Sequence, residues 1–159
     1  MNRVSIFLLL VVALSLSCNK NDPNISDIDC DSESLCFKVG DVPVTQPASW
    51  RTISANRIRI YWQTLDGNNY KNVEIDVWGT TTGTYSIKPR SSSSPSATFQ
   101  YFVTDGSSTK NWQGESGTIT ISSTDNDKLA GSFKVSVKDT ASGETKDITN
   151  GTFSDLPKK

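Results

Sequence analysis

Glu74 and Asp76 are the residues whose types and spacing could support catalysis. On a β-strand, residues two apart point to the same face and lie about 7 Å from each other. Glycoside hydrolases use two carboxyl groups at about 5–10 Å, one as acid and the other as nucleophile or base. Arg57 and Arg59 share the same alternation, which equally fits a solvated ladder of opposite charges. The charge ladder is the simpler interpretation, and a carboxylate-based hydrolase is the alternative.

Histidine is missing from the whole chain. This removes the commonest general base, the usual partner of a nucleophilic side chain and the commonest metal ligand. The glycines at Gly143 and Gly151 occupy hairpin positions rather than a phosphate-binding loop. Residues 125–128 lack the later glutamate of a calcium-binding loop and predict a tight turn. We therefore expect a protein that is not an enzyme and that uses no cofactor or metal.

Aromatic rings accompany the charged residues. Trp78 and Tyr61 alternate in phase with them, so they could form a platform for a glycan or a protein ligand. The simpler interpretation of Trp78 is a cation–π pair with Arg57. Two further tryptophans either extend the platform or cap the core. Trp50 lies at an expected sheet edge, and Trp112 lies in an expected loop or strand end. The predicted platform consists of Trp78, Tyr61, Arg57, Arg59, Glu74 and Asp76.

The N-terminus is typical of a bacterial secretory signal that ends in a lipidated cysteine. Arg3 provides a positive start, and an apolar stretch from Ile6 to Leu16 follows, too short to span a bilayer. The residues just ahead of Cys18 resemble the relaxed lipoboxes of Bacteroidota-type bacteria. We therefore expect residues 1–17 to be removed and Cys18 to carry the lipid.

The lipid would place the protein in the cell envelope, with a membrane as its first partner. Stable anchoring takes more than one acyl chain, which a lipidated cysteine supplies. Asn19 follows the anchor, in place of the aspartate that retains enteric lipoproteins at the inner membrane. By that analogy we expect the outer membrane, with the periplasmic and surface faces both open.

Cys30 and Cys36 remain as a pair once Cys18 is lipidated. An even number of cysteines in an oxidising compartment favours a disulfide. The alternative is a metal site in which the two thiolates are joined by nearby carboxylates. Two cysteines with carboxylates form an uncommon ligand set, so the disulfide is the prediction. The carboxylates of the alternative are Asp29, Asp31 and Glu33.

The mature chain divides into an acidic tether and one domain. Residues 18–35 contain several acidic residues, Pro23 and few apolar side chains, as a solvated tether does. Residues 36–159 form the single domain. Loss of the signal moves the formal charge from -1 to -2, because Arg3 leaves with it. No basic stripe alternates with aromatic residues, so nucleic acid is not an expected partner.

One hairpin is specified by its own alternation. Segments 57–65 and 70–78 are joined by a short polar loop, and we place Leu65 opposite Tyr70. This register puts Trp62 on one face together with Ile60 and the aliphatic residues paired with them. It pairs opposite charges on the other face, and a slip of one residue would destroy both patterns.

Further strands follow the same period of two. At the C-terminal hairpin, Val137 opposite Ile148 leaves the flanking phenylalanines out of register, which predicts a β-bulge at Asn150-Gly151. About eight or nine antiparallel strands indicate an all-β fold, either a β-sandwich or an up-and-down β-barrel. The loop 89–96 is expected to be exposed and mobile. The predicted strands are 84–88, 97–104, 117–122, 129–138 and 144–153, with 37–39 and 50–54 as edge strands.

The C-terminal third resembles a family of small β-rich lipoproteins of Bacteroidota-type bacteria. The resemblance lies in residues 129–133, in 148–153 and in the Leu156-Pro157 pair that ends the hairpin. The segments 117–121 and 83–85 are similar to its middle strands. The family brings no established activity, so the resemblance implies a fold and an anchor but no catalytic residue.

Asp139-Thr140-Ala141 resembles the acceptor for O-glycosylation in the periplasm of such bacteria, with Thr140 as the modified residue. It falls at an expected hairpin tip, where a glycan has room. Three-residue matches are common by chance, so Thr140 is a candidate site only.

Three functions are compatible with these observations. The first is a lipid-anchored, non-catalytic binding or accessory domain with a glycan or protein ligand. The second is a structural or envelope-interaction protein without a small-molecule site, whose exposed strand edges dock onto a partner chain. The third is the carboxylate-based hydrolase.

Overall fold

The computed structural model describes residues 30–89 and 95–159. The predicted signal peptide, the lipidation site Cys18 and residues 18–29 of the predicted tether lie outside the described residues, as do residues 90–94 of the predicted loop. In the described part of the chain, no helix is long and apolar enough to cross a membrane.

The described chain forms ten strands, which confirms the all-β prediction and slightly exceeds the expected number of strands. The sequence does not predict β2, because its two prolines argue against a strand. Proline is tolerated at a sheet edge, and β2 is an edge strand. The strands are β1 Ser34–Val39, β2 Val42–Pro47, β3 Ser49–Ser54, β4 Arg57–Asp66, β5 Asn69–Trp78, β6 Gly83–Ile87, β7 Ser96–Asp105, β8 Ser108–Ser123, β9 Lys128–Asp139 and β10 Thr145–Pro157.

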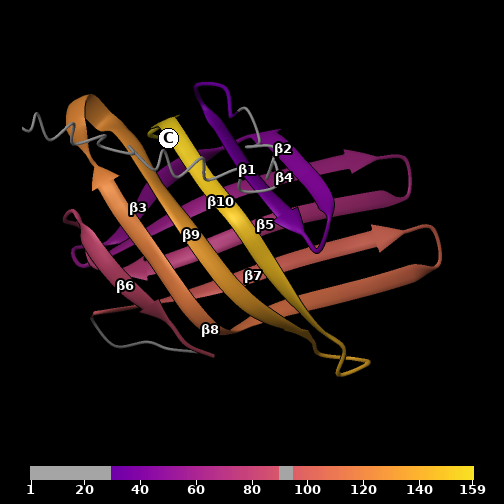
Figure 1. Ribbon diagram of the computed structural model, residues 1–159. Coiled ribbons are helices and arrows are strands. Elements are labelled where there is room, and N and C mark those ends of the chain that lie inside the picture. Colours follow the sequence, from indigo (N-terminus) through magenta and orange to yellow (C-terminus); the bar gives the residue numbers. More distant parts are fainter. Residues whose placement is uncertain (1–29, 90–94) are drawn as a thin grey trace, which may run out of the picture.

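All ten strands belong to one sheet in the order β2-β1-β10-β9-β8-β6-β7-β5-β4-β3. The sheet folds over itself, so that β1, β10, β9 and the second half of β8 run diagonally across β4, β5 and β7 (Figure 1). It is not closed by a continuous ladder. Its two end strands, β2 and β3, follow each other in the chain through Ala48, and β3 also meets the residues after β10, where Trp50 bridges Lys158 and the Lys159 amide donates to the Trp50 carbonyl at 2.9 Å. The fold therefore lies between the sandwich and the barrel alternatives.

The sheet forks at β8. The first half of β8 pairs with β7 as far as Gln113 opposite Gln100, and the second half pairs with β6 from Gly117 onward. A register shift between Gly114 and Ser116 marks the change of partner. β6 lies between β8 and β7 and pairs with β7 at one position, Ile87 with Ala97, in parallel. An opening remains where the pairing of β7 with β8 ends, beside the residues that follow β6.

The core lies between the two layers. Phe37, Phe99, Tyr101 and Phe133 pack together with ring centroids 5.5–6.5 Å apart. The predicted alternation of β7 is confirmed, because Phe99 and Tyr101 are buried while Phe102 packs on the outside. Burying one such ring contributes about 1.5–3 kcal/mol.

The predicted hairpin of β4 and β5 is confirmed. Leu65 pairs with Tyr70, Ile60 with Ile75, and each intermediate residue follows in the same register. Trp62 is buried in the core, as its phase predicts. The charged positions therefore share the opposite face.

The register of β9 and β10 differs from the prediction by two residues. Ile148 pairs with Val135 rather than with Val137. The cause is the carboxylate of Asp139, which accepts hydrogen bonds from the backbone amide and the hydroxyl of Ser142 and widens the loop after β9. A shift of two residues leaves every side chain on its own face.

The β-bulge predicted at Asn150-Gly151 is confirmed. After Ile148, which pairs with Val135, the next pair of the ladder is Gly151 with Phe133, so two residues of β10 stand opposite one residue of β9 and one of them is extra. Asn150 has a φ of 51°, a conformation that asparagine tolerates better than most residues.

The predicted end of the tether at residue 35 is wrong. β1 begins at Ser34, Leu35 is fully buried, and the Glu33 amide donates to the Ser154 carbonyl at 2.7 Å. The first strand is also not an edge, because β1 lies between β2 and β10. The expected edge strand at residues 50–54 is correct, since β3 ends the sheet.

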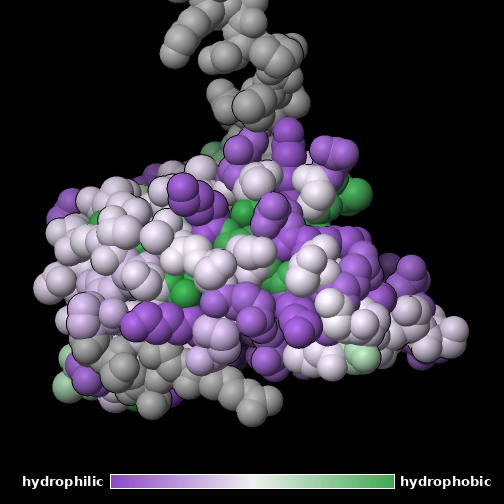
Figure 2. Space-filling view, turned by 60° about the horizontal axis from the view of Figure 1, so that its bottom comes forward, coloured by the Kyte–Doolittle hydropathy of each residue, from purple (hydrophilic) through white to green (hydrophobic). Residues whose placement is uncertain are grey.

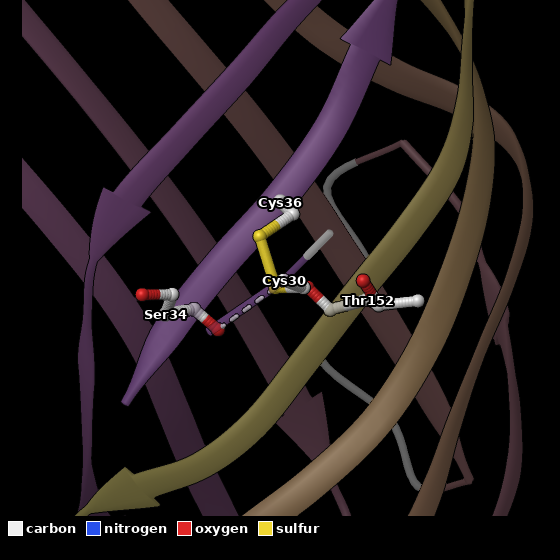
Figure 3. Close-up of a disulfide and its surroundings, with 4 residues drawn as sticks. All are labelled: Cys30, Ser34, Cys36 and Thr152. Atoms are coloured by element: carbon white, nitrogen blue, oxygen red, sulfur yellow. Dashed lines mark hydrogen bonds between the residues drawn. A yellow bond between two sulfur atoms is a disulfide. The ribbon is translucent and has the colours of Figure 1, made fainter. Parts of the chain in front are cut away.

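Cys30 and Cys36 form the predicted disulfide, with Cα atoms 5.8 Å apart (Figure 3). The Cys30 Sγ lies 3.6 Å from the carbonyl oxygen of Ser34 and 3.9 Å from that of Thr152. The bond consumes both sulfurs, so neither is available as the thiolate ligand of the alternative metal site. It ties the start of the described chain to the middle of β1.

Candidate functional site

The six residues of the predicted platform come together on the outer face of β4 and β5. The antiparallel register sets Arg59 opposite Asp76 and Tyr61 opposite Glu74. β3 adds Arg51, which pairs with Arg59 on the neighbouring strand and which the sequence prediction omitted. We call this surface the arginine–carboxylate face; it comprises Arg51, Arg57, Arg59, Tyr61, Glu74, Asp76 and Trp78.

Asp76 is the centre of an ion-pair network. Its side chain is 7% exposed, and Arg59 contacts its two oxygens at 2.8 and 2.9 Å. Arg57 donates a further hydrogen bond to Oδ2. Burial acts to raise the pKa of Asp76, but the hydrogen bonds from Arg59 and Arg57 together hold it below its ordinary value. Both oxygens are therefore occupied by arginine donors.

Glu74 has the opposite electrostatic character. Burial raises its pKa above the ordinary value, and Arg59, 2.8 Å from Oε1, offsets only part of that effect. Its side chain is half-buried at 30% exposure. Of the two carboxylates of the face, Glu74 is thus the one that arginines hold less tightly and that still reaches solvent.

Cations cover both aromatic rings of the face. The Arg57 guanidinium lies 4.9 Å from the centroid of Trp78, and that of Arg51 lies 5.1 Å from the centroid of Tyr61. The predicted cation–π pair of Trp78 and Arg57 is therefore present. The Nε atom of Arg57 is buried without a hydrogen-bond partner, so the stacking and the bond to Asp76 hold this side chain. Both rings remain partly exposed.

The other two tryptophans are not part of this surface. Trp112 lies inside β8 and is buried, which corrects its placement in a loop or strand end. Trp50 is buried on the edge strand β3, and its indole N–H donates to the Asp127 carbonyl at 3.2 Å. Lysines cover the exposed sides of both rings. Both therefore cap the core.

A pocket adjoins the arginine–carboxylate face at the fork of the sheet. It has a volume of about 130 Å³ and a floor formed by Phe99 and Gly114. Glu74 belongs to both surfaces and makes them continuous. We call this hollow the fork pocket; its polar lining consists of Glu74, Lys88, Thr98, Gln100 and Gln113.

The sequence gives no local signal for the fork pocket. Gln100 and Gln113 lie on different strands and come together only because β7 and β8 are paired there. The Gln100 side chain donates to the Asn111 carboxamide at 2.9 Å, which fixes its orientation. Lys88 follows β6, and its amide donates to the Ala97 carbonyl at 2.9 Å.

The combined surface can bind but offers little for covalent chemistry. It supplies one accessible carboxylate, two carboxamides, an ammonium group and two partly exposed rings. Asp76 would have to act as the second carboxylate of a hydrolase, and its oxygens are already bonded to arginines. Among the described residues, no group of three histidine, cysteine or acidic side chains could hold a metal ion.

The rest of the visible surface is hydrophilic. Figure 2 shows polar side chains over most of one face of the molecule, with apolar residues visible only as small patches. The candidate O-glycosylation residue Thr140 is exposed in the loop after β9. Its neighbour Asp139 is 1% exposed, and the Ser142 hydroxyl, at 2.5 Å, lowers its pKa. The aspartate of this triplet therefore has a structural role in the turn.

One family model matches the chain. It is described as "Domain of unknown function (DUF6252)" and covers residues 53–157, from the end of β3 to the end of β10. Most of the arginine–carboxylate face and the whole fork pocket lie inside that match. No curated protein and no solved structure matches the chain.

Proposed function

The chain belongs to the family described as Domain of unknown function (DUF6252), and we propose that it is a lipid-anchored, non-catalytic glycan-binding domain of the cell envelope. The single observation that carries the proposal is the continuity of the arginine–carboxylate face with the fork pocket through Glu74.

The fork pocket has the side chains that recognise hydroxyl groups. A carboxylate such as Glu74 accepts hydrogen bonds from hydroxyls, and the carboxamides of Gln100 and Gln113 both donate and accept. Thr98 adds a hydroxyl of its own. A pocket of about 130 Å³ fits one sugar ring or part of one, rather than a folded peptide.

The arginine–carboxylate face would hold the neighbouring sugar unit. Sugar rings present C–H groups that pack on flat aromatic surfaces, and hydroxyls that bond to charged groups at the rim. Arg57 covers part of Trp78, so the remaining aromatic surface is the exposed part of Trp78 and of Tyr61. Binding here would therefore be weak per site and dependent on the pocket.

The geometry argues against the hydrolase. A retaining or inverting mechanism needs a second carboxylate that can attack the sugar or activate a water molecule. Asp76 is bonded to Arg57 and Arg59, and freeing it would leave two partly buried guanidinium groups without that carboxylate partner. Glu74 alone supplies an acid but no nucleophile.

The membrane anchor is the part of the proposal supported by the sequence alone. The apolar N-terminal stretch and Cys18 support export and lipidation, and Asn19 beside the anchor favours the outer membrane. The disulfide between Cys30 and Cys36 fits an oxidising compartment such as the periplasm.

Intrinsic tryptophan fluorescence tests the proposal. The chain from residue 18 onward, carrying Cys18→Ser, would be titrated with a panel of soluble envelope and host polysaccharides. We expect a saturable change with at least one of them, lost in Trp78→Ala and weakened about tenfold or more in Glu74→Gln, one carboxylate contact being worth roughly 1.5–3 kcal/mol.

The matched control is Gln63→Ala, an exposed residue of β4 outside the face and the pocket. It should bind as the parent chain does, and urea unfolding should show that all three variants are folded. A flat response to the whole panel by a folded parent chain would overturn the glycan proposal.

A further inference from the structure

Positive charge is in excess on the surface that the arginine–carboxylate face and the fork pocket form together. Four cations stand against two carboxylates there, although the formal charge of the whole chain is -1. A local charge opposite in sign to that of the chain attracts an anionic ligand. The cations are Arg51, Arg57, Arg59 and Lys88, and the carboxylates are Glu74 and Asp76.

Two of these cations are not used within the protein. Both carboxylates of the surface are bonded to Arg57 and Arg59. Arg51 and Lys88 form no ion pair with any residue that the structure describes. Both residues are exposed, so their charges can meet a ligand.

Arg51 is ordered, and its hydrogen-bond donors stay open. Its guanidinium group lies 5.1 Å from the centroid of the Tyr61 ring. Stacking occupies the flat side of the guanidinium, whereas its N–H groups lie in the plane and match the geometry of a carboxylate. The charge of Arg51 acts on Glu74 only at longer range. Arg51 is therefore a positioned donor for an acid group of a ligand.

The fork pocket combines one cation with one carboxylate. Among the described residues that line it, Lys88 carries the only positive charge and Glu74 the only negative charge. Glu74 is bonded to Arg59 at 2.8 Å rather than to Lys88. A carboxylate has about four acceptor positions, so Glu74 can still accept a hydrogen bond from a hydroxyl group.

This combination selects the ligand of the pocket. Lys88 requires an acid group and Glu74 requires a hydroxyl donor, and a uronic acid carries both on one ring. A neutral sugar would leave Lys88 without an ion pair. The side chain of an aspartate or a glutamate would bring acceptors but no donor for Glu74. The pocket therefore favours an acidic sugar over a neutral one and over an acidic peptide, including the chain's own acidic segment.

The two unused cations lie at opposite ends of one row across the sheet. Arg51 stands opposite Arg59, and Arg59 stands opposite Asp76. Asp76 in turn stands opposite Thr98, which lines the fork pocket. Neighbouring strands are about 4.8 Å apart, so the row from β3 to β7 covers about 14 Å. A single sugar ring cannot span this row, but an oligosaccharide that crosses the strands can.

We propose that the ligand of this surface is an acidic polysaccharide, with one uronate ring in the fork pocket and the carboxylate of a later sugar unit at Arg51. The carboxylate of the ring in the pocket pairs with Lys88, and a hydroxyl of that ring donates to Glu74. This inference rests on the glycan-binding function proposed above and names the class of its ligand.

Uronate tetramers test the ligand class. The chain from residue 18 onward, carrying Cys18→Ser, would be titrated calorimetrically with tetramers of galacturonate, of mannuronate and of hyaluronan. Each would be compared with the same tetramer after reduction of its carboxyl groups to neutral hydroxymethyl groups. We expect at least one acidic tetramer to bind about tenfold more tightly than its neutral form. The difference should shrink when the salt concentration rises from about 0.01 M to about 0.15 M.

Substitutions separate the two ends of the surface. Lys88→Gln should weaken the binding of a uronate dimer and of the tetramer alike, by about tenfold. Arg51→Gln should weaken only the tetramer, because a dimer held in the pocket is too short to reach β3. Lys71→Gln is the matched control, since Lys71 is an exposed lysine of β5 outside the face and the pocket. It should leave both affinities unchanged.

The proposal has clear contrary outcomes. If no acidic tetramer binds more tightly than its neutral form, the acidic class is refuted, while binding of any neutral glycan would leave the proposed function in place. Binding of tetraglutamate as tight as that of the uronates would show a response to negative charge alone and also refute it. A gain of about tenfold for the uronates in the triple variant Asp22→Asn, Asp27→Asn, Asp29→Asn would make the chain's own acidic segment the occupant.

Discussion

At the scale of single residues, Asp76 decides how the candidate surface is organised. A buried carboxylate is stable only when its charge is compensated, and here Arg57 and Arg59 provide that compensation from the neighbouring strand. The same contacts orient the arginines and hold Arg57 over Trp78. Removing the carboxylate would leave two partly buried cations facing each other.

We expect Asp76→Asn to lower the free energy of unfolding at pH 7 by about 2 kcal/mol, between the values for exposed and buried pairs. The folded-state pKa of Asp76 lies below its ordinary value, so its contribution is present above that value and is lost as the pH falls through the folded pKa. The parent chain should therefore lose more stability than the variant between pH 7 and pH 3. Urea unfolding at both pH values measures the difference.

Asp147→Asn is the matched control, because Asp147 is an exposed aspartate on β10. It should change the free energy of unfolding by less than about 0.5 kcal/mol at either pH. An Asp76→Asn variant with the same pH dependence as the parent would show that the ion pair does not contribute to stability.

At the scale of elements, the bulge in β10 depends on a missing side chain. A Cβ atom on Gly151 would lie 2.5 Å from the backbone oxygen of Phe133 and 2.6 Å from its ring. Neither neighbour can move freely, because Phe133 packs among the core rings. Glycine is required there by close packing rather than by its dihedral angles.

We expect Gly151→Ala to destabilise the protein by about 3 kcal/mol, the upper end of the usual overpacking cost, because the added Cβ would collide with backbone and with a packed ring. Thermal unfolding followed by circular dichroism measures the loss. Gly67→Ala is the comparison, since Gly67 has a φ of 58° with nothing near its missing Cβ and should cost about 1 kcal/mol. Equal effects of the two substitutions would argue against the collision at Gly151.

The elements also show what the sequence can predict. The β4–β5 register follows from the alternation of apolar and polar residues alone, because a shift of one residue would bury Arg59 and expose Ile60. The β9–β10 register does not follow from alternation. It depends on the hydrogen bonds of Asp139 within the loop after β9, and these leave no trace in the alternation pattern. β2 escapes prediction because Pro43 and Pro47 are acceptable only at an edge, and edge position is a property of the assembled sheet.

At the scale of the whole molecule, one part of the candidate site can be predicted from a single hairpin and the other part cannot. The arginine–carboxylate face is local, built from one hairpin, and could be predicted. The fork pocket requires β5, β7, β8 and the residues after β6 to meet, so no single segment encodes it.

The disulfide between Cys30 and Cys36 closes a short loop at the start of the described chain. Replacing both Cys30 and Cys36 with serine should lower the free energy of unfolding by about 2 kcal/mol, the entropy of a loop of this length. Urea unfolding of the double variant measures the loss. The parent chain in reducing agent should show the same decrease in its free energy of unfolding. Unchanged stability in both would contradict the expectation.

The same bond has a mechanical consequence. A pull on the chain ahead of Cys30 passes through the sulfur bridge to Cys36 and bypasses residues 31–35. Ser34 and Leu35, which pair with Ser154 and Phe153, therefore carry no tension. The load enters β1 inside the sheet, between β2 and β10, where many backbone bonds must shear together instead of opening one by one. If Cys18 carries the proposed lipid, a pull from the membrane would therefore enter the domain where it resists being peeled apart.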